Sequence, residues 1–349
     1  MKKDVNPRVL VVSTSRKTRG GITAVLKLYE QSEMWRKYHC RWVGTHRDGN
    51  SFRKIWYFAR ACVQYVFLLP FYDIVHFHIS LPTTAKRKYP LFKLAKLFGK
   101  KTILHLHCGS QIDDIWNDKY QFMFEHCDCG ILLSESLKRK VEERVGMSDR
   151  FKVIYNPCPK INDTKQYEKK NHVLFSGTLY EGKGYKDLIK AFAAVAAKYP
   201  DWKIVLAGNG ETEQAHSLAE ELGISSQVVL LGWVSGEEKH RAFCEAKALC
   251  LPSYAEGFPM AVLDAWAYGL PVITTPVGGI PDVAVDGENM LLFEPGDIEQ
   301  LSRCLEKMID DESLRMRIGK ESELLASTTF KVTTICEQVG ALYKELIGN

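Results

Sequence analysis

The 349-residue chain lacks the features that mark a membrane-spanning or disulfide-bonded protein. No run reaches the roughly 20 apolar residues that a transmembrane helix needs. There is no CxxC pair among the ten cysteines, and the close spacing Cys127-Asp-Cys129 has no second pair that would complete a zinc site. A short basic tail leads directly into an apolar segment, without the pattern of a signal peptide. We therefore expect a cytoplasmic protein with reduced thiols.

Acidic residues are scarce in the first half of the chain. Residues 1–170 hold 32 Lys and Arg against 16 Asp and Glu, whereas residues 171–349 hold 15 against 26. This asymmetry suggests different partners for the two halves, and the basic half could meet an anionic membrane surface or a phosphorylated substrate. A scattered, solvated surface would also explain it. We expect no nucleic-acid partner, because the basic residues accompany no recognisable nucleic-acid-binding motif.

Short apolar segments alternate with helical segments along the whole chain. Such alternation predicts a parallel sheet covered by helices, and the series occurs twice. We therefore predict an α/β protein with two Rossmann-like, doubly wound parallel-sheet domains that face a central cleft containing the ligand site. Strands are expected at residues 8–13, 73–78, 102–107, 129–133, 152–155, 172–176, 203–207, 227–231, 248–251 and 272–274.

The domain boundary is expected in a polar segment. Residues 156–171 contain two prolines and many polar side chains, which is typical of a linker. We accordingly assign residues 1–165 to an N-terminal domain and 166–331 to a C-terminal domain. Residues 332–349 have helical spacing and form a separate C-terminal helix.

Two segments of the first half mix apolar and basic residues. Residues 52–72 are rich in aromatic side chains, and residues 86–101 place several lysines around leucine and phenylalanine. Such mixtures are typical of a helix that lies in a membrane interface. The alternative is an amphipathic helix that packs on the first sheet with its lysines in water. Both interpretations remain open from the sequence.

The most specific segment of the sequence is Ser253–Gly269. It places Glu256 and Asp264 eight positions apart, around a turn that leads into a helix beginning near Met260. Backbone N–H groups at the start of a helix suit a phosphate or sugar hydroxyls. Glu256 precedes that helix and Asp264 lies one turn inside it, so both carboxylates could reach one ligand. A second glycine-rich loop follows the strand expected at 272–274.

These motifs resemble those of the retaining glycosyltransferases of family 4, in particular the enzymes of bacterial surface-polysaccharide synthesis. The signature of that family is two Glu separated by seven residues in the context EGFP…LEA, and here it reads Glu256-Gly-Phe-Pro…Leu-Asp264-Ala. The sequences GLPVITTPVGGIPD and Gly177-Thr-Leu-Tyr-Glu-Gly-Lys-Gly184 are also similar to the family. In the first half the resemblance depends on Gly20-Gly21, DIVHFH and HLHCGS. It implies the GT-B fold.

The resemblance also implies a role for each matching residue. Glu256 would hold hydroxyls of the donor sugar, and Asp264, one methylene shorter than the usual Glu, would hold the nucleotide ribose. Lys183 would neutralise the leaving diphosphate, while Thr178 stands where the family has an Arg. His107 would hydrogen-bond the donor sugar. Glu256, His107 and Lys183 are thus the implied catalytic residues.

The other implied donor-binding residues act mainly through their backbone. They are Gly20, Gly21, Gly177, Val234, Gly257, Phe258, Pro259 and Met260, with Lys239 near Val234. The strand histidines His76, His78 and His105 are expected to be core or surface residues. We expect no metal site and no cofactor apart from the nucleotide sugar as co-substrate.

The implied reaction is retaining transfer of a hexose or N-acetylhexosamine from a nucleotide-diphosphate sugar, by default a UDP-sugar. The acceptor would be a hydroxyl of a growing surface glycan, which a lipid carrier could hold. The N-terminal domain would bind the acceptor, the C-terminal domain the donor, and the last helix would cross back to the N-terminal domain. The expected location is the cytoplasm, with the inner face of the plasma membrane as a second site.

Three alternatives remain open from the sequence. A transferase of the same fold could use a GDP-sugar. An epimerase or phosphorylase of the same fold could act on a related substrate. A catalytically silent partner could bind a nucleotide sugar or a glycan, and the departures at Thr178 and Asp264 keep that alternative open.

Overall fold

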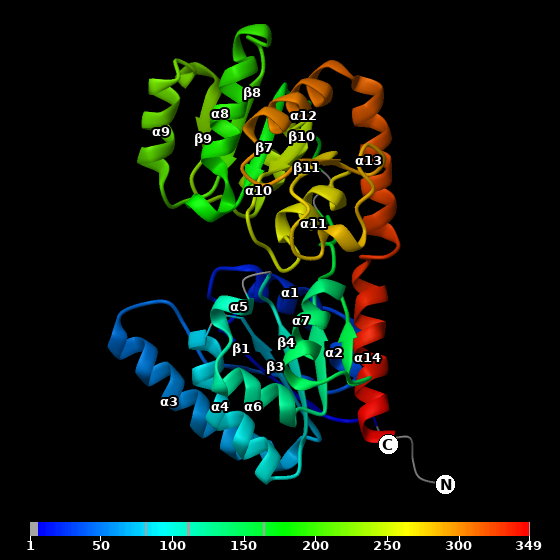
Figure 1. The fold of residues 1–349 in the computed structure, drawn as a ribbon. Helices are drawn as coiled ribbons and strands as arrows, with labels where there is room; N and C mark the ends of the chain where they lie inside the picture. Colours follow the sequence, from blue (N-terminus) through cyan, green and yellow to red (C-terminus); the bar gives the residue numbers. More distant parts are fainter. Residues whose placement is uncertain (1–5, 81, 110–111, 163–164, 349) are drawn as a thin grey trace. The chain divides into compact units, whose positions relative to one another are not determined.

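The computed structural model describes residues 6–80, 82–109, 112–162 and 165–348 (Figure 1). Contacts divide the chain into two units, residues 1–157 with 332–349 and residues 158–331. The division falls within the polar segment 156–171, eight residues before the boundary assigned from the sequence. Each unit contains one six-stranded parallel sheet, so the prediction of two doubly wound α/β domains is confirmed.

The first sheet has the strand order β2-β1-β3-β4-β5-β6. Its central strands are buried on both faces, because helices cover both sides of a parallel sheet. The winding direction changes between β1 and β3, which makes this pair the switch point of the sheet. The strands are β1 (Val9–Ser13), β2 (Arg41–Gly44), β3 (Ile74–Ile79), β4 (Lys101–Leu106), β5 (Cys129–Leu132) and β6 (Phe151–Val153).

The second sheet has the strand order β12-β11-β10-β7-β8-β9. Its switch point lies between β7 and β10, which are neighbours in the sheet although 71 residues separate the end of β7 from the start of β10. The loops that follow these two strands therefore leave the sheet side by side. The strands are β7 (His172–Ser176), β8 (Lys203–Ala207), β9 (Val228–Leu230), β10 (Ala248–Leu251), β11 (Val272–Thr274) and β12 (Leu291–Leu292).

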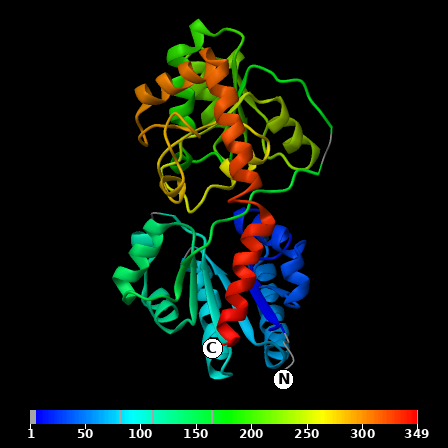
Figure 2. The ribbon, with the colours of Figure 1, turned by 90° about the vertical axis from the view of Figure 1, so that its right-hand side faces the viewer.

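Helices cover both faces of the first sheet. Phe77 of β3 contacts Phe92 of α4 on one face, while the neighbouring His76 contacts Tyr343 of α14 on the other. The C-terminal helix α14, red in Figure 2, thus packs on the first unit together with α1 and α2. The helices of this unit are α1 (Gly21–Glu30), α2 (Glu33–Lys37), α3 (Ser51–Leu68), α4 (Pro82–Leu97), α5 (Ile112–Ile115), α6 (Asp118–His126), α7 (Glu135–Val145) and α14 (Val332–Gly348).

The helices of the second unit pack in pairs around its sheet. Helix α8 contacts α12, and α11 contacts α13. The helices are α8 (Tyr185–Val195), α9 (Thr212–Glu221), α10 (Glu237–Glu245), α11 (Met260–Ala267), α12 (Ile298–Asp310) and α13 (Glu312–Ser327). Strands β2 and β12 were not predicted from the sequence. All ten cysteines carry free thiols.

The two segments that mix apolar and basic residues form α3 and α4. Helix α4 packs on the sheet and buries Leu91 and Phe92, so the packing alternative is correct for this helix. The expectation that its lysines lie in water is wrong for Lys88, which is fully buried and donates to the His78 carbonyl. Helix α3 buries only Ala61 and Tyr65 and leaves a broad apolar face exposed, with Phe52 77% accessible. Among the described residues, no helix is both long enough and apolar enough to cross a bilayer.

Candidate functional site in the second unit

The loops after β7 and β10 meet at the carboxyl edge of the second sheet. In a doubly wound sheet, ligands bind outside the carboxyl ends of the strands at the switch point, which is where these loops lie. The backbone N–H of Tyr254 donates to the carbonyl of Gly182 at 3.0 Å. Gly184 has a φ of +67°, and a Cβ added there would lie 2.0 Å from the Pro252 carbonyl oxygen. Glycine at this position therefore allows the two loops to touch.

This contact brings Lys183 and Glu256 together. The Lys183 ammonium forms an ion pair with Glu256 Oε1, and Ser253 Oγ donates to the same oxygen at 2.8 Å. The two side chains are 21% and 11% exposed, so the pair is partly shielded from water. Two of the three side chains expected to be catalytic are therefore in direct contact. Ser253 was missed, although it precedes Glu256 by three residues.

The glycine-rich loop after β11 supports the backbone around Glu256. Gly278 has a φ of +64°, and an added Cβ would lie 2.3 Å from the Glu256 carbonyl oxygen. The N–H of Gly279 donates to the carbonyl of Gly257 at 2.7 Å, and Thr275 Oγ1 donates to the carbonyl of Ser253 at 2.5 Å. This support was not predicted, although the glycine pair after the strand was a signal for it.

Asp264 lies on α11, which begins directly after Pro259. Its side chain is 11% exposed, and the carboxylate accepts a hydrogen bond from Lys239 Nζ at 2.6 Å. Burial raises the pKa of Asp264, and the Lys239 ammonium opposes that rise. Lys239, which was expected near Val234, is thus a direct partner of the second carboxylate of the motif.

The remaining residues expected in the donor site of this unit follow strand ends. The N–H of Gly177 already donates to the Ala207 carbonyl at 3.1 Å, and the Thr178 side chain is exposed. Phe258 is buried, and its ring packs against Trp266 and Phe330. Gly257 and Met260 are half-buried on either side of Phe258 and Pro259, and Val234 is half-buried between β9 and α10.

In the first unit, the predicted residues lie at the carboxyl edge of the first sheet. Gly20 and Gly21 follow β1, are exposed, and mark the start of α1, with Gly20 at a φ of +133°. His107 follows β4, and its Nε2 lies 2.8 Å from His78 Nδ1. Burial, together with the charges of neighbouring groups, lowers the pKa of His107 to about 3. The ring is therefore neutral at pH 7 and can exchange hydrogen bonds without carrying charge.

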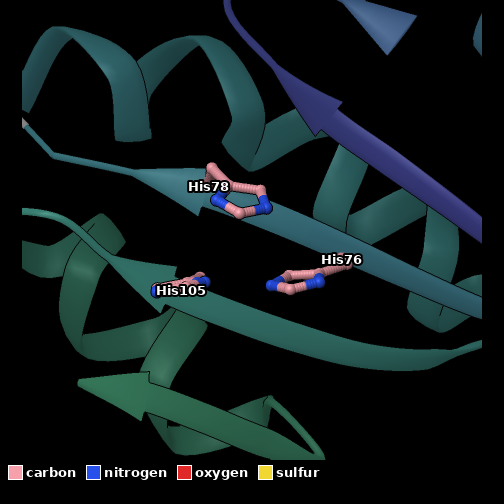
Figure 3. A group of neighbouring side chains, drawn as sticks. All are labelled: His76, His78 and His105. Atoms are coloured by element: carbon pink, nitrogen blue, oxygen red, sulfur yellow. The ribbon is translucent and has the colours of Figure 1, made fainter. Parts of the chain in front are cut away.

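Three further histidines lie beneath His107. His76, His78 and His105, which are drawn in Figure 3, are fully buried, so of the two expected places, core or surface, they lie in the core. One ring nitrogen of each lies within 4.8 Å of those of the other two. However, the rings of His76 and His78 are stacked, with centroids 4.4 Å apart at 23°. Because nitrogen lone pairs lie in the ring plane, stacked rings do not direct them at one ion, and the arrangement favours packing over metal binding.

Comparison with known proteins agrees with this geometry. Residues 159–324 match the sequence model of the family described as glycosyl transferases group 1. The chain is 28% identical over 216 residues to an uncharacterized glycosyltransferase of Haemophilus influenzae, covering 61% of this chain and 60% of that protein. It is 28% identical over 235 residues to the capsular polysaccharide biosynthesis glycosyltransferase CapM of Staphylococcus aureus, covering 62% and 61%. The match thus spans about three fifths of the length of these two relatives.

The fold comparison extends over nearly the whole chain. The structure is similar to that of Anabaena HepE in complex with UDP-glucose, with a TM-score of 0.78 and 18% identity over 97% of this chain and all of that one. At this identity the similarity concerns the fold, which is GT-B. The family match lies within the second unit, and the similarity to the GT-B fold extends over both units.

Proposed function

We propose that the chain is a retaining glycosyltransferase of family 4. It moves a hexose or N-acetylhexosamine from a nucleotide-diphosphate sugar, with UDP as the nucleotide, to a hydroxyl of a growing surface glycan. The Lys183–Glu256 pair at the switch point of the second sheet carries the proposal, because it places a cation and a carboxylate where such folds bind nucleotides. The similarity to CapM and to the UDP-glucose complex of HepE supports the choice of donor and pathway.

In this proposal the donor binds with its diphosphate at Lys183 and its sugar at Glu256. The bond between the anomeric carbon and the diphosphate oxygen breaks, and the leaving diphosphate takes the electron pair. The acceptor oxygen forms the new bond on the same face, and its proton passes to a diphosphate oxygen. Lys183 stabilises the negative charge that develops on the diphosphate, and Glu256 stabilises the positive charge on the sugar. This step assigns no role to a metal ion.

Asp264 and three residues of the first unit also have roles in the proposal. Asp264 accepts a hydrogen bond from the ribose, with Lys239 fixing the orientation of its carboxylate. In the first unit, the proposal assigns diphosphate binding to the backbone of Gly20 and Gly21, and a hydrogen bond with the sugar to neutral His107. The first unit binds the acceptor and meets the cytoplasmic face of the membrane. Its excess of basic residues and the exposed apolar face of α3 support that location.

Calorimetric titration of the purified chain tests the proposal. UDP, GDP, ADP and CMP would be titrated in EDTA, with UDP expected to bind. Lys183→Ala should weaken UDP binding by roughly 10- to 100-fold, because one charge-assisted contact is worth about 1.5–3 kcal/mol. Lys186→Ala is the matched control, since this lysine lies three residues further along and pairs with Glu211.

The outcomes separate the alternatives. Binding of GDP alone would identify a GDP-sugar as the donor. Binding of no nucleotide would refute the donor site. If UDP binds, incubation with UDP-sugars and a glycan acceptor, followed by NMR of the product, tests retention. Inversion at the anomeric carbon would contradict the proposed reaction, and binding without any transfer would favour a silent partner.

A further inference from the structure

A second concave site lies in the first unit, between strand β2 and helix α3. Its volume is about 460 Å³, which is within the range of small-molecule sites. Three arginines, two aromatic rings and no carboxylate are among the described residues that line it. The lining side chains that carry the argument are Arg16, Arg41, Trp42, Tyr57, Arg60 and Gln64.

One wall of this pocket is fixed before any ligand binds. Arg16 Nε donates to both carboxylate oxygens of Glu30, at 2.9 and 3.0 Å, and its guanidinium lies 4.7 Å from the centroid of the Trp42 ring. Trp42 Nε1 in turn donates to the Thr14 carbonyl at 2.7 Å. Because these side chains are already ordered, a ligand would lose little affinity to their immobilisation.

The other two arginines remain available. Arg41 and Arg60 are exposed, and neither has an ion-pair partner within the described parts of the chain. Guanidinium groups bind phosphate oxygens through paired hydrogen bonds, and two arginines that line one cavity fit a phosphate or diphosphate group. With Glu30 already paired to Arg16, the electrostatics of the pocket favour an anion.

The same helix presents an apolar face outside the pocket. Tyr57, Arg60, Ala61 and Gln64 follow the helical spacing i, i+3, i+4, i+7 and form the pocket stripe. Beside that stripe, large apolar side chains are exposed, with Phe52 77% and Phe67 73% accessible. The full apolar set is Phe52, Ile55, Trp56, Val63, Val66 and Phe67. Contiguous exposed apolar surface of this kind marks an interaction site.

We propose that this pocket binds the phosphate or diphosphate group of a hydrocarbon-linked phosphate, whose chain lies along the apolar face of α3. An anionic head and an apolar chain on one molecule match the two adjacent surfaces in charge and in polarity. The inference rests on the proposed function and adds that such a molecule carries the glycan acceptor. It assigns Arg41 and Arg60 to the head group and Phe52 and Phe67 to the chain.

The test uses farnesyl diphosphate and inorganic diphosphate as probes. Both are titrated calorimetrically into full-length Lys183→Ala, in which the proposed donor site is weakened. Farnesyl diphosphate should bind, and Arg41→Gln with Arg60→Gln should weaken it by roughly tenfold or more. The control is Arg36→Gln with Arg139→Gln, which removes the same charge from exposed positions outside the pocket.

Three results would overturn the inference. The first is that farnesyl diphosphate does not bind. The second is that Arg36→Gln with Arg139→Gln loses as much affinity for it as Arg41→Gln with Arg60→Gln. The third is that inorganic diphosphate binds as tightly as farnesyl diphosphate. The last would assign the pocket to a soluble phosphate instead of a lipid. Phe52→Ser with Phe67→Ser should abolish the preference for the farnesyl chain and leave inorganic diphosphate binding unchanged. A failed donor site would appear separately, as loss of UDP binding in the unmodified chain.

Discussion

Replacing Glu256 with glutamine is expected to separate nucleotide binding from transfer. The Lys183 ammonium is paired with the Glu256 carboxylate, so an incoming diphosphate must compete with that carboxylate for the lysine. Glutamine keeps the size of the side chain and can still accept the hydrogen bond from Ser253 Oγ. It removes the charge that holds Lys183. Glu256→Gln should therefore bind UDP more tightly while transferring sugar more slowly.

The size of the effect follows from the burial of the pair. An exposed ion pair contributes about 0.2–1 kcal/mol, and a hydrogen bond to a charged group about 1.5–3 kcal/mol. With side chains 21% and 11% exposed, the Lys183–Glu256 pair lies between these cases, at about 1 kcal/mol. Releasing Lys183 should tighten UDP binding by roughly fivefold. Loss of one preorganised electrostatic contact should lower kcat by about 10²–10³-fold.

A double-mutant cycle measures this competition. UDP would be titrated into the unmodified chain, Glu256→Gln, Lys183→Met and the double variant. The gain in affinity from Glu256→Gln should vanish when Lys183 is absent. Glu211→Gln is the control, because its carboxylate interacts with Lys186 and not with Lys183. Weaker UDP binding by Glu256→Gln, or an equal gain in the Lys183→Met background, would refute the reasoning.

Three further predictions concern stability and surfaces. Gly278→Ala should destabilise the chain by about 1–3 kcal/mol in chemical denaturation, because the residue has a φ of +64° and an added Cβ meets the Glu256 carbonyl. Lys239→Met should lower the free energy of unfolding by about 1–2 kcal/mol at pH 7, since it leaves the buried Asp264 carboxylate unpaired while Lys239 itself is 36% exposed. Phe52→Ser with Phe67→Ser should reduce flotation of the chain with anionic vesicles.

Each of these predictions has its own contrary result. Gly232→Ala is the control for Gly278→Ala, because Gly232 has a similar φ of +67° but no atom lies within 4 Å of the added Cβ. An equal loss of stability in both variants would show that the contact with the Glu256 carbonyl is not the cause. Burial raises the pKa of Asp264, so its folded form favours protonation and its contribution to stability falls as pH rises through that pKa. The cost of Lys239→Met should therefore shrink in acid, and a pH-independent cost would contradict this account. Undiminished flotation would place any vesicle contact away from α3.

Much of the fold could be predicted because strands of a parallel sheet are continuous apolar runs. Residues 172–176 and 203–207 were predicted at their observed bounds, since helices cover both sides of these strands. Strand β2 was missed because it lies at the sheet edge and begins with the exposed Arg41. Strand β12 has only two residues, too few to produce a pattern.

Most residues of the candidate site could be predicted from the sequence, but the contacts between them could not. The motif around Glu256 and Asp264 is local, and family resemblance added Lys183 from 73 residues earlier in the chain. No spacing rule shows that Lys183 and Glu256 touch, because this contact depends on Gly184 lying against Pro252. Whether α3 packs on the sheet or exposes its apolar face could not be predicted for a similar reason. The answer depends on which of its side chains the rest of the unit covers, and tertiary packing decides this.

The pairing of Lys183 with Glu256 also gives the Thr178 substitution a consequence. Where resemblance leads one to expect an Arg beside the diphosphate, Thr178 is exposed and uncharged, so more of the charge compensation would fall on Lys183. Without donor, that lysine is neutralised by Glu256 and the pair carries no net charge. If the Lys183 ammonium pairs with the diphosphate instead, the Glu256 carboxylate becomes available to accept a hydrogen bond from a sugar hydroxyl. One exchange of ion-pair partners would then place Lys183 on the diphosphate and Glu256 on the sugar. Donor binding and the arrangement of the catalytic groups would therefore depend on the same ion pair.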